Sequence, residues 1–554
     1  MSSPNLTATA LLASLASHLF FKRYEPTDPL RLVALLVISP LIITLCQEDP
    51  RGVFVPFLRC CSLYYAGLLT SIMAYRISPI HPLSKYPGPV LCKISKLWLA
   101  FVVSRGNLHL YIQALHDKYG PVIRIGPNEL SVTDISLLPS ILGSNGMPKG
   151  PLWSGRKIVR TKGTTSKEEA ALANLISCRD RQLHAEARKA WNRAFIPAAI
   201  KGYEPMLIGR VAQLVEAIVL ILWVISCKSL VHGRFTPLKN SWEIRFGGGF
   251  ELMRDGDKDG LWHTLERGLY LPALTEQIPW CVGFIPYLPM IGKEKNALGK
   301  FAFNQATRRL QAGSVQNDLF YYLMDDKRTD AKPYPFPLVV TNSVLAIIAG
   351  ADTTATVLAN TFFLLLSHPE SYKRLQSELD EAFPRGGTEP TDTVLLSRLP
   401  YLNAVIKESL RLLPPVPTSL QRAPTIGTGS KVLGDSLIIP EGTSVVVPPY
   451  TIHRDPRYFS PSPEKYIPDR WLSKDDTKIL VTEDAFLPFS TGPANCVGRN
   501  LGMLELRMVM AYIMRAFELQ FSDGYDKLRW EVDLKDYFVM QKGSLPVKVT
   551  RRTA

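Results

Sequence analysis

The sequence lacks the cysteine and charge patterns that would place it among small disulfide-bonded, zinc-binding or nucleic-acid-binding proteins. Its eight cysteines are scattered over 554 residues, and only Cys60 and Cys61 are adjacent. Because no paired spacing predicts a disulfide framework or a zinc site, a reducing compartment is favoured. The net charge of +15 comes from basic residues spread along the whole chain, without a terminal basic arm. With no zinc-finger spacing and no aromatic-basic RNA-binding signature, we expect no nucleic-acid partner.

The positive charge has two possible explanations. A solvated basic surface is the simpler one, and contact with anionic lipid head groups or an acidic electron donor is the other. Hydrophobic residues make up 46% of the chain, which is enough for a large folded core. The length allows one large domain or two ordinary ones.

The N-terminal residues 1–75 predict a membrane anchor. They hold three apolar runs, none with a persuasive signal-peptide cleavage site, so the segment is expected to be retained. Each run is shorter than the ~20 residues that span a bilayer comfortably, so both three spans and one span with re-entrant or interfacial pieces remain open. Basic residues after the first and third runs predict that the chain beyond Tyr75 lies in the cytosol. The runs are Thr7–Phe21, Leu32–Cys46 and Cys60–Tyr75.

A stiff connector over residues 76–90 follows the anchor. It contains Pro82, Pro87 and Pro89, and proline fixes its own backbone dihedral and restrains the residue before it. Residues 108–119 then predict an amphipathic helix, and residues 122–133 predict strands.

One segment, residues 217–245, is atypical. Its apolar block 218–227 is too short to span a membrane and too uniformly apolar for a surface helix. As a hypothesis, we interpret the segment as a read-through intron or an alternative splice product.

The most informative stretch is a bend near the C terminus that carries a single cysteine. It reads Phe489-Ser-Thr-Gly-Pro-Ala-Asn-Cys496-Val-Gly and precedes a predicted helix over residues 501–517. Its glycines let the backbone pass close under a porphyrin, and nearby amides can donate to a thiolate that holds haem iron. Taken alone, Cys496 is also compatible with a small buried hydrophobic residue.

Three further elements precede this bend. A long apolar helix predicted over residues 337–367 contains Ala-Gly-Ala-Asp-Thr-Thr at 349–354. Glycine in such a helix costs about 1 kcal/mol, and helix packing through small residues is the simpler explanation for it. Glu408 and Arg411 lie on one helical face, a spacing that is also common in surface pairs. Arg470 follows in a Pro-Asp-Arg-Trp segment.

These elements, in this order, resemble the cytochrome P-450 superfamily, and the resemblance covers the chain from about Pro82 to the C terminus apart from 217–245. It implies a mainly α domain with small β-sheets over residues 91–554, with haem b between the long central helix and the cysteine loop. Cys496 is then the thiolate ligand of the iron, and Phe489 is the aromatic residue that opens the loop. The family usually has Arg or His where this chain has Ala494, so the counter-charge for a haem propionate must come from elsewhere, or haem binds less tightly.

The resemblance also implies residues for the haem propionates. His184 and Arg188 lie one turn apart and resemble the family's Trp-x-x-x-Arg helix, with His184 in the tryptophan's place. Arg188 is therefore a candidate for a charge-assisted bond to a propionate, although an exposed surface arginine is the alternative. Arg422 and His453 are secondary candidates, and each is also compatible with a capped loop residue.

The family's oxygen-activation positions match Gly350, Asp352 and Thr353. The implied roles are space for dioxygen at Gly350 and proton delivery through Asp352 and Thr353. Glu408, Arg411 and Arg470 match a buried structural triad of the family. The implied substrate pocket contains residues whose simpler explanation is ordinary core: Val344, Ile347, Ile348, Val416, Thr418, Phe538 and Val539.

The function implied is that of a membrane-bound haem-thiolate monooxygenase of the fungal microsomal type. It would insert one oxygen atom from dioxygen into a bulky apolar substrate such as a terpenoid, steroid or polycyclic aromatic, in secondary metabolism or xenobiotic oxidation. Electrons would come from NADPH through a membrane-bound reductase, with the catalytic domain on the cytosolic side of the endoplasmic reticulum. The alternatives are a haem-thiolate isomerase or dehydratase, against which Asp352 and Thr353 argue, and a non-catalytic haem-binding or mis-spliced product.

Overall fold

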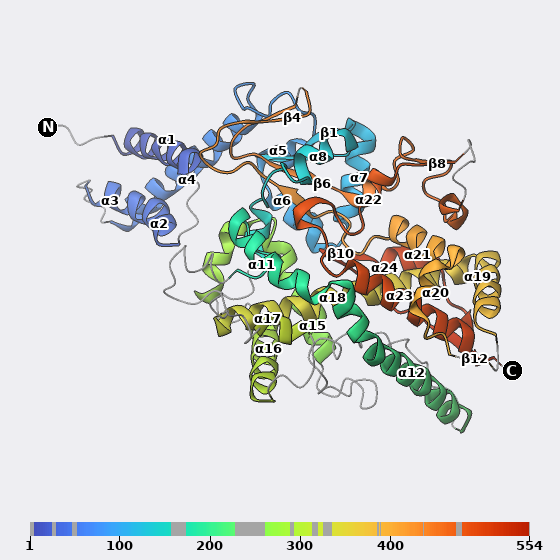
Figure 1. Cartoon of the computed structure of the whole chain (residues 1–554). Coiled ribbons are helices and arrows are strands. Elements are labelled where there is room, and N and C mark those ends of the chain that lie inside the picture. The colour runs from blue at the N-terminus through green and yellow to red at the C-terminus, as the bar shows by residue number, and fades with distance from the viewer. Residues whose placement is uncertain are drawn as a thin grey trace.

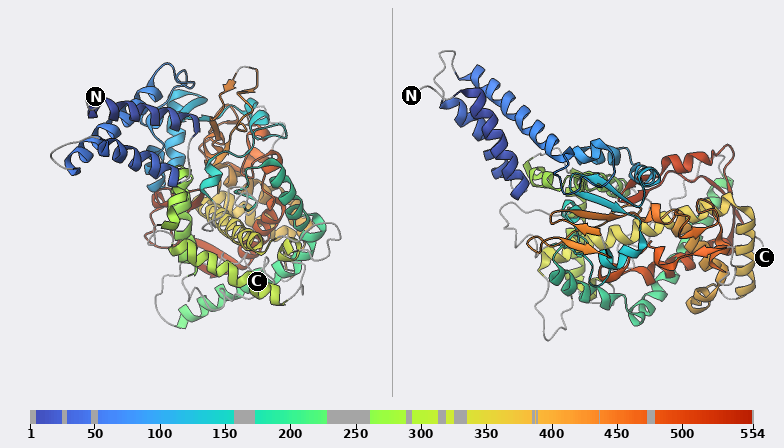
Figure 2. Two further views of the ribbon diagram at one scale, coloured as in Figure 1. Left: turned by 90° about the vertical axis from the view of Figure 1, so that its left-hand side faces the viewer. Right: turned by 90° about the horizontal axis from the view of Figure 1, so that it is seen from above.

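The computed structural model of the chain shows a mainly helical body with a helical arm at its N terminus (Figure 1). The arm projects from one side of the body, and the C terminus lies at the opposite side (Figures 1 and 2). The residues that the structure describes are 5–24, 29–46, 53–156, 173–227, 261–287, 293–312, 319–324, 335–384, 387, 389–435, 437–472 and 479–552.

The N-terminal arm consists of apolar helices that pack on one another. α1 and α4 lie side by side, as two views show (Figure 2). Tyr64 of α4 donates a hydrogen bond to the Ser17 hydroxyl of α1 at 2.6 Å, which fixes the register of the pair. The outer faces expose apolar side chains, including Leu12, Phe54 and Leu69. The arm contains α1 (Leu6–Tyr24), α2 (Pro29–Val33), a π-helical turn (Ala34–Ile38), α3 (Ser39–Leu45) and α4 (Phe54–Ile77).

The three predicted apolar runs all lie in helices of this arm, but only the third belongs to a helix both long and apolar enough to cross a bilayer. That helix is α4, in which flanking apolar residues from Phe54 extend the third run as expected. In the described part of the chain, the other helix of sufficient length and apolarity is α18 (Phe336–Ser367). Because 67% of the residues in its most apolar stretch are buried inside the protein, α18 is the central helix of the body.

The largest sheet lies beside the helices that follow the arm. Its strand order is β1-β2-β6-β3, and β2 and β6 run parallel while the other pairs are antiparallel. Successive residues of β6 enter different hydrophobic clusters, with Val445 and Val447 on one face and Val446 on the other, so both faces are covered. The bounds are β1 Val122–Gly126, β2 Glu129–Val132, β3 Leu420–Arg422 and β6 Ser444–Val447.

Four two-stranded antiparallel ribbons complete the β-structure in the described residues. They pair β4 (Lys431–Leu433) with β5 (Leu437–Ile439), β7 (Phe459–Ser460) with β8 (Leu480–Val481), β9 (Phe517–Phe521) with β12 (Val547–Arg551), and β10 (Lys535–Tyr537) with β11 (Val539–Gln541). The expected mainly α fold with small sheets is therefore what the structure has.

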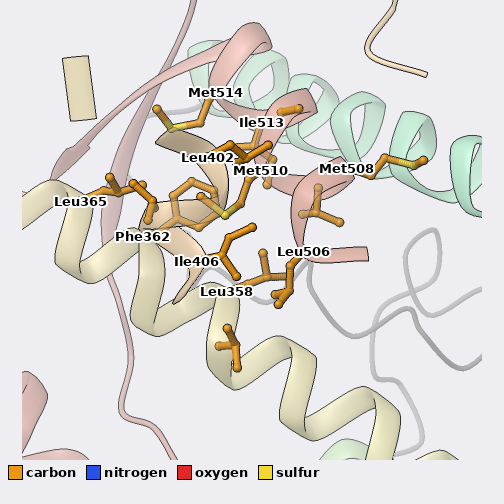
Figure 3. Packing of buried hydrophobic residues seen from close by; sticks show 14 of the residues in the cluster. Leu358, Phe362, Leu365, Leu402, Ile406, Leu506, Met508, Met510, Ile513 and Met514 are labelled. Atoms are coloured by element: carbon orange, nitrogen blue, oxygen red, sulfur yellow. The ribbon is translucent and has the colours of Figure 1, made fainter. Parts of the chain in front are cut away.

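The main hydrophobic core lies between three helices. These are α18, α21 (Pro400–Leu412) and α23 (Arg499–Ala516). Their apolar faces meet around side chains such as Phe362 and Met510 (Figure 3). The core therefore fixes α18 relative to the residues just before α23, where the cysteine loop is found.

The remaining helices surround this core and the sheet. Two of them begin at aspartate caps: the Asp180 carboxylate accepts from the Leu183 amide before α11, and Asp392 accepts from Leu395 before α20, each at 2.9 Å. The α-helices are α5 (Val90–Ile94), α6 (Leu97–Ser104), α7 (Leu108–Tyr119), α8 (Leu138–Leu142), α9 (Leu152–Gly155), α11 (Arg181–Ala194), α12 (Pro197–Cys227), α15 (Leu261–Thr275), α16 (Lys293–Ala312), α17 (Leu319–Met324), α19 (Pro369–Ala382), α20 (Thr393–Arg398), α22 (Pro449–Ile452) and α24 (Leu528–Asp533). Segments of 3-10 helix occur at η2 (Ile135–Leu137), η3 (Pro279–Tyr287), η4 (Pro468–Trp471), η5 (Glu483–Ala485) and η6 (Gly492–Ala494).

The helix predicted over 108–119 is α7, and the strands predicted over 122–133 are β1 and β2. Of the atypical segment 217–245, residues 217–227 form the end of α12. Residues 228–245 lie outside the described part of the chain, so the splice hypothesis stays a prediction.

Candidate active site

The cysteine loop is a closed bend that contains the 3-10 turn η6 and precedes helix α23. The Cys496 amide donates to the Phe489 carbonyl at 2.9 Å, which closes the loop over the residues between them. Gly492 has φ 70°, and a Cβ there would collide with the Leu142 carbonyl, so only glycine fits at this contact. The Cys496 side chain is exposed and lies just before the N terminus of α23, where the helix dipole favours an anionic sulfur.

Helix α18 carries an accessible strip in the middle of an otherwise buried helix. Ala349 is exposed and Thr353 is half-buried, whereas Gly350 and Asp352 are buried. The Thr353 hydroxyl donates to the Ala349 carbonyl at 2.5 Å, so the strip contains a hydroxyl held in one place by its own helix. Thr354 donates to Glu505 of α23 at 3.3 Å, which ties this part of α18 to the helix that follows the cysteine loop.

Arg188 lies against the cysteine loop. Its guanidinium donates to the Asn495 carbonyl and to the Asn495 side-chain oxygen, each at 2.6 Å. Burial lowers the pKa of Arg188, and the charge of Cys496 opposes that shift. The neighbouring His184 is buried one turn earlier on α11, and burial together with Lys149 and Arg188 lowers its pKa to about 3. The two residues therefore share one side of α11, next to the loop.

Lys149 is a buried cation of this region that the sequence analysis missed. Its ammonium donates to the Leu175 and Ile176 carbonyls at 2.7 and 3.0 Å, and burial lowers its pKa to about 7. Lys149 forms a β-bridge with Arg422, which is 2% exposed and whose pKa burial lowers to about 10. No sequence spacing links positions 149 and 422, so only the bridge reveals that they are neighbours.

His453 is fully buried, and both of its ring nitrogens contact backbone groups. Its Nδ1 lies 2.9 Å from the Arg411 carbonyl, and its Nε2 accepts from the Leu487 amide at 2.8 Å. Burial lowers its pKa to about 3, which keeps the ring neutral. With both nitrogens engaged, the ring has no donor left for an anion, so this geometry does not support the predicted propionate contact. The geometry instead ties α21 to the segment before the cysteine loop.

The structure brings together Glu408, Arg411 and Arg470, all at most 2% exposed. Arg411 donates to both Glu408 oxygens at 2.8 and 2.9 Å, and Arg470 donates to one of them at 3.0 Å. The Trp471 indole also donates to Glu408 at 2.9 Å. Burial would raise the Glu408 pKa, but Arg411 and Arg470 lower it. The cluster fastens α21 to η4.

The predicted pocket residues fall into two groups. Val344 and Ile347, with Ile348 beside them, pack against Ala302 and Ala306 of α16. The second group lies around the β10–β11 turn and α9: Val416, Phe538 and Val539 belong to one cluster, and Thr418 donates to Asp536 at 2.8 Å.

A buried ion pair adjoins the second group and was also missed. Arg156, just after α9, donates to Glu276, just after α15, at 2.7 Å, and its guanidinium lies 3.6 Å from the Phe538 ring centroid. Burial raises the pKa of Glu276 to about 7 and that of Asp536 to about 6, with Arg156 opposing both shifts. This side of the predicted pocket is therefore charged as well as apolar.

The residues fit the haem that the sequence resemblance implies. An exposed sulfur precedes a helix N terminus, and an accessible strip crosses a buried helix tied to that same helix. Arg188 binds the loop and lies near the buried cations Lys149 and Arg422. Among the described residues no carboxylate is paired with Lys149, Arg188 or Arg422, which suits the binding of an anionic group. Cys496 would hold the iron, and the cations would meet the propionates.

Comparisons with known proteins agree with this geometry. The family profile described as cytochrome P450 matches residues 292–548. Cytochrome P450 67 of Uromyces fabae is 32% identical over 547 residues, which cover 96% of each chain. Cytochrome P450 monooxygenase nodW of Hypoxylon pulicicidum is 31% identical, covering 87% of this chain and 85% of the relative. Tryprostatin B 6-hydroxylase of Aspergillus fumigatus is 28% identical, covering 98% of this chain and 96% of the relative.

Proposed function

Because this chain belongs to the cytochrome P450 family and is a cytochrome P450 monooxygenase, we propose that it hydroxylates a bulky, largely apolar molecule in secondary metabolism. The observation that carries the proposal is the exposed Cys496 in a closed loop just before α23, a helix that is tied to the Ala349–Thr353 strip of α18. Relatives named as monooxygenases and as a hydroxylase support the reaction type. A terpenoid, a steroid and a polycyclic aromatic are the substrate classes that we favour.

When bound, haem b supplies the activation of dioxygen and the transfer of one oxygen atom. Cys496 would hold the iron as a thiolate, with Phe489 closing the loop behind it by its carbonyl. Arg188 and Arg422, with His184 beside them, would orient the cofactor through its propionates.

On the side of the haem opposite Cys496, α18 would provide room for dioxygen and the groups that transfer protons. Gly350 has no side chain and leaves room next to the exposed Ala349. Thr353 holds its hydroxyl at a fixed point by donating to the Ala349 carbonyl, and its oxygen can accept one proton and pass on another. Asp352 is buried at the preceding position, and its carboxyl group can supply a new proton to the Thr353 hydroxyl. Apolar residues from α18 and the β10–β11 turn would bind the substrate body.

Electrons would come from NADPH through a membrane-bound reductase. A hollow beside the cysteine loop is lined by Lys407, Arg499 and Arg507 together with Phe489. This basic face is suited to an acidic electron donor, and steering by charge makes its association dependent on salt.

The N-terminal arm would anchor the enzyme in the endoplasmic reticulum, with the body in the cytosol. The length of α4 and the apolar surface of the arm support this membrane attachment. Residues 76–90 would form the hinge between anchor and body.

A spectroscopic experiment tests the proposal. Wild-type protein in microsomes, reduced and treated with carbon monoxide, is expected to show the red-shifted Soret band of a thiolate-bound haem. Cys496→Ser is expected to lose that band and NADPH-dependent oxygen insertion, whereas Cys281→Ser, at a half-buried free cysteine elsewhere, is expected to keep both. Unchanged spectra and turnover in Cys496→Ser contradict the proposal. Substrate conversion by the wild type without dioxygen consumption indicates an isomerase or dehydratase instead.

A further inference from the structure

We propose that the N-terminal arm crosses the membrane of the endoplasmic reticulum three times. The crossing segments are α1, the helical stretch over residues 29–45 and α4, and the N terminus lies in the lumen. The inference rests on the proposed attachment of the arm to this membrane. It goes further because the length of α4 supports a single crossing, whereas three crossings place lipid around all the outer faces of the arm.

The first argument is that α1 is polar on its buried side and apolar on its outer side. Ser14, Ser17 and His18 are at most 9% exposed, whereas Leu12 is 67% exposed. A helix that lies flat on a membrane keeps a charged or polar face toward water. Within residues 10–21, which the structure describes, α1 has no such face. Small and polar residues at the helix contact, with apolar residues outside, are typical of helices that pack on one another within a bilayer.

The second argument is that the π-helical turn in the middle of residues 29–45 obtains its polar partners from α4. The Leu35 carbonyl accepts from the Tyr64 hydroxyl at 2.8 Å, and the Leu36 carbonyl accepts from the Tyr65 hydroxyl at 2.6 Å. In hydrocarbon, every backbone polar group needs a partner within the protein. These bonds supply such partners at an irregular turn without water, as a segment inside a bilayer requires.

The third argument is the direction of the three segments. α1 and α4 run parallel, because their contacts advance by four residues on both helices together. Residues 25–28 can bridge at most about 18 Å, which is less than the length of α1, about 28 Å. Residues 29–45 therefore start where α1 ends and run back. The parallel contacts pair Ser14 with Gly67, His18 with Ser71 at 2.6 Å, and Lys22 with the Tyr75 ring at 4.0 Å.

The lengths of the segments fit this membrane. The hydrocarbon layer of the endoplasmic reticulum is about 27 Å thick, which is thinner than average. α1 is about 28 Å long, and the unbroken helical stretch over residues 29–45 is about 25 Å long. α4 is longer, about 36 Å, and can be accommodated by a tilt. Segments that are short for an average bilayer are therefore long enough for this one.

The charges agree with a lumenal N terminus. The N terminus lies at the tip of the arm, away from the body (Figures 1 and 2). Lys22 and Arg76 lie at the opposite end, next to the body, and Arg31 is near the start of the returning segment. With the body in the cytosol, the positive-inside tendency places these residues on the cytosolic side. Arg59, in the second turn of α4, is close enough to the outer end for its long side chain to reach the lumenal head groups.

Glycosylation mapping of the full-length protein in microsomes tests the inference. Asn5→Gln first removes the native acceptor Asn5-Leu-Thr. A polar extension with an Asn-Gly-Thr acceptor is then placed before residue 1, within residues 25–28, or within residues 46–52. The first and third positions are expected to acquire a glycan, seen as a mass shift that endoglycosidase removes, and the second is expected to stay unmodified. If α4 alone crosses the membrane, all three positions are lumenal, so a glycan at the second overturns the inference.

A protease experiment gives a positive signal for the same connection. A cleavage site for a sequence-specific protease is inserted within residues 25–28, and the protease is added outside sealed microsomes. Cleavage is expected without detergent, because three crossings place this connection in the cytosol. The matched control is the same site within residues 46–52, which should be cut only after detergent is added. Protection of residues 25–28 until detergent is present contradicts three crossings.

The outcomes separate the inference from the proposed function. The wild type and the insertion variants should sediment with the membranes after an alkaline wash and keep the carbon monoxide spectrum. Variants that meet both conditions but carry a glycan within residues 25–28 show a single crossing, and they leave the oxygen-inserting function intact. A wild type that keeps the spectrum but does not sediment would overturn the membrane attachment and the three crossings together.

Discussion

At the scale of single residues, side chains of one type obtain opposite roles from their surroundings. His184 and His453 both have a pKa lowered to about 3. In His453 the cause is full burial, and the backbone occupies both nitrogens. In His184 the cations Lys149 and Arg188 add to burial, so an anion bound nearby would change its environment. The same imidazole is therefore a tie between elements in one place and part of a candidate anion site in the other.

Thr353 offers a sharp test at this scale. Thr353→Val removes the hydroxyl on the accessible strip of α18 but keeps the shape of the side chain. Because proton delivery by a placed group contributes about 100-fold or more, product formation should fall by that order while NADPH and dioxygen are still consumed and peroxide is released. The measurement is the ratio of product to NADPH oxidised.

The control for this prediction is Thr361→Val. Thr361 lies on the same helix and also donates to the carbonyl four residues earlier, at 2.8 Å, but it is fully buried in the core. Its replacement should leave the ratio unchanged. Equal coupling in Thr353→Val and wild type would show that the hydroxyl plays no part in oxygen activation.

At the scale of secondary-structure elements, buried polar ties join segments that are distant in sequence. Glu408 gathers Arg411 from its own helix and Arg470 from η4, and His453 ties α21 to the residues before the cysteine loop. The ion pair of Arg156 with Glu276 joins the end of α9 to the end of α15 in the same way. The two ionic ties, at Glu408 and between Arg156 and Glu276, depend on complete pairing, because a single buried charge without its partner is strongly unfavourable.

The Glu408 cluster should therefore dominate local stability. Glu408→Gln leaves two buried guanidinium groups without a negative partner and should lower the free energy of unfolding by about 3–5 kcal/mol. Urea unfolding of the haem-loaded protein, followed by the Soret band, measures the change.

Asp469→Asn is the matched control, one residue before Arg470. It breaks the Arg374–Asp469 pair, in which the side chains are 52% and 50% exposed, so it should cost at most about 1 kcal/mol. Similar losses in the two variants would argue that burial does not determine the strength of the cluster.

At the scale of the whole molecule, the arm and the body have different surfaces. The arm exposes large apolar side chains on α1 and α4, whereas the apolar residues of α18 are covered by the body. Projection of the arm from one side keeps this apolar surface together (Figure 2). That arrangement suits attachment to a bilayer while the body remains in water.

Two truncations test this division. Removal of residues 1–52 leaves α4, which is long enough to span a membrane and should keep the protein in the membrane pellet. Removal of residues 1–77 should release the body into the supernatant with its carbon monoxide spectrum intact. Sedimentation after an alkaline wash measures both. Release by the shorter truncation would show that α4 alone is insufficient, and retention after the longer one would place the membrane contact on the body.

The sequence by itself determined the features that depend on local spacing. The Cys496 loop, the long apolar helix with Asp352 and Thr353, and the three-residue step from Glu408 to Arg411 are set by neighbours in the chain. Helical and turn geometry therefore makes them readable without the fold. The mainly helical fold with small sheets was implied by the family resemblance that these motifs carry.

Only the tertiary structure decided which buried charges meet. Lys149 lies opposite Arg422, and Arg156 meets Glu276, because strands and helices far apart in the chain pack together. His453 is joined to the segment before the cysteine loop for the same reason, since the Leu487 amide donates to its Nε2, and this geometry does not support its predicted role. The energy of a buried charge depends on every group around it, and that set is fixed by packing and not by spacing along the chain.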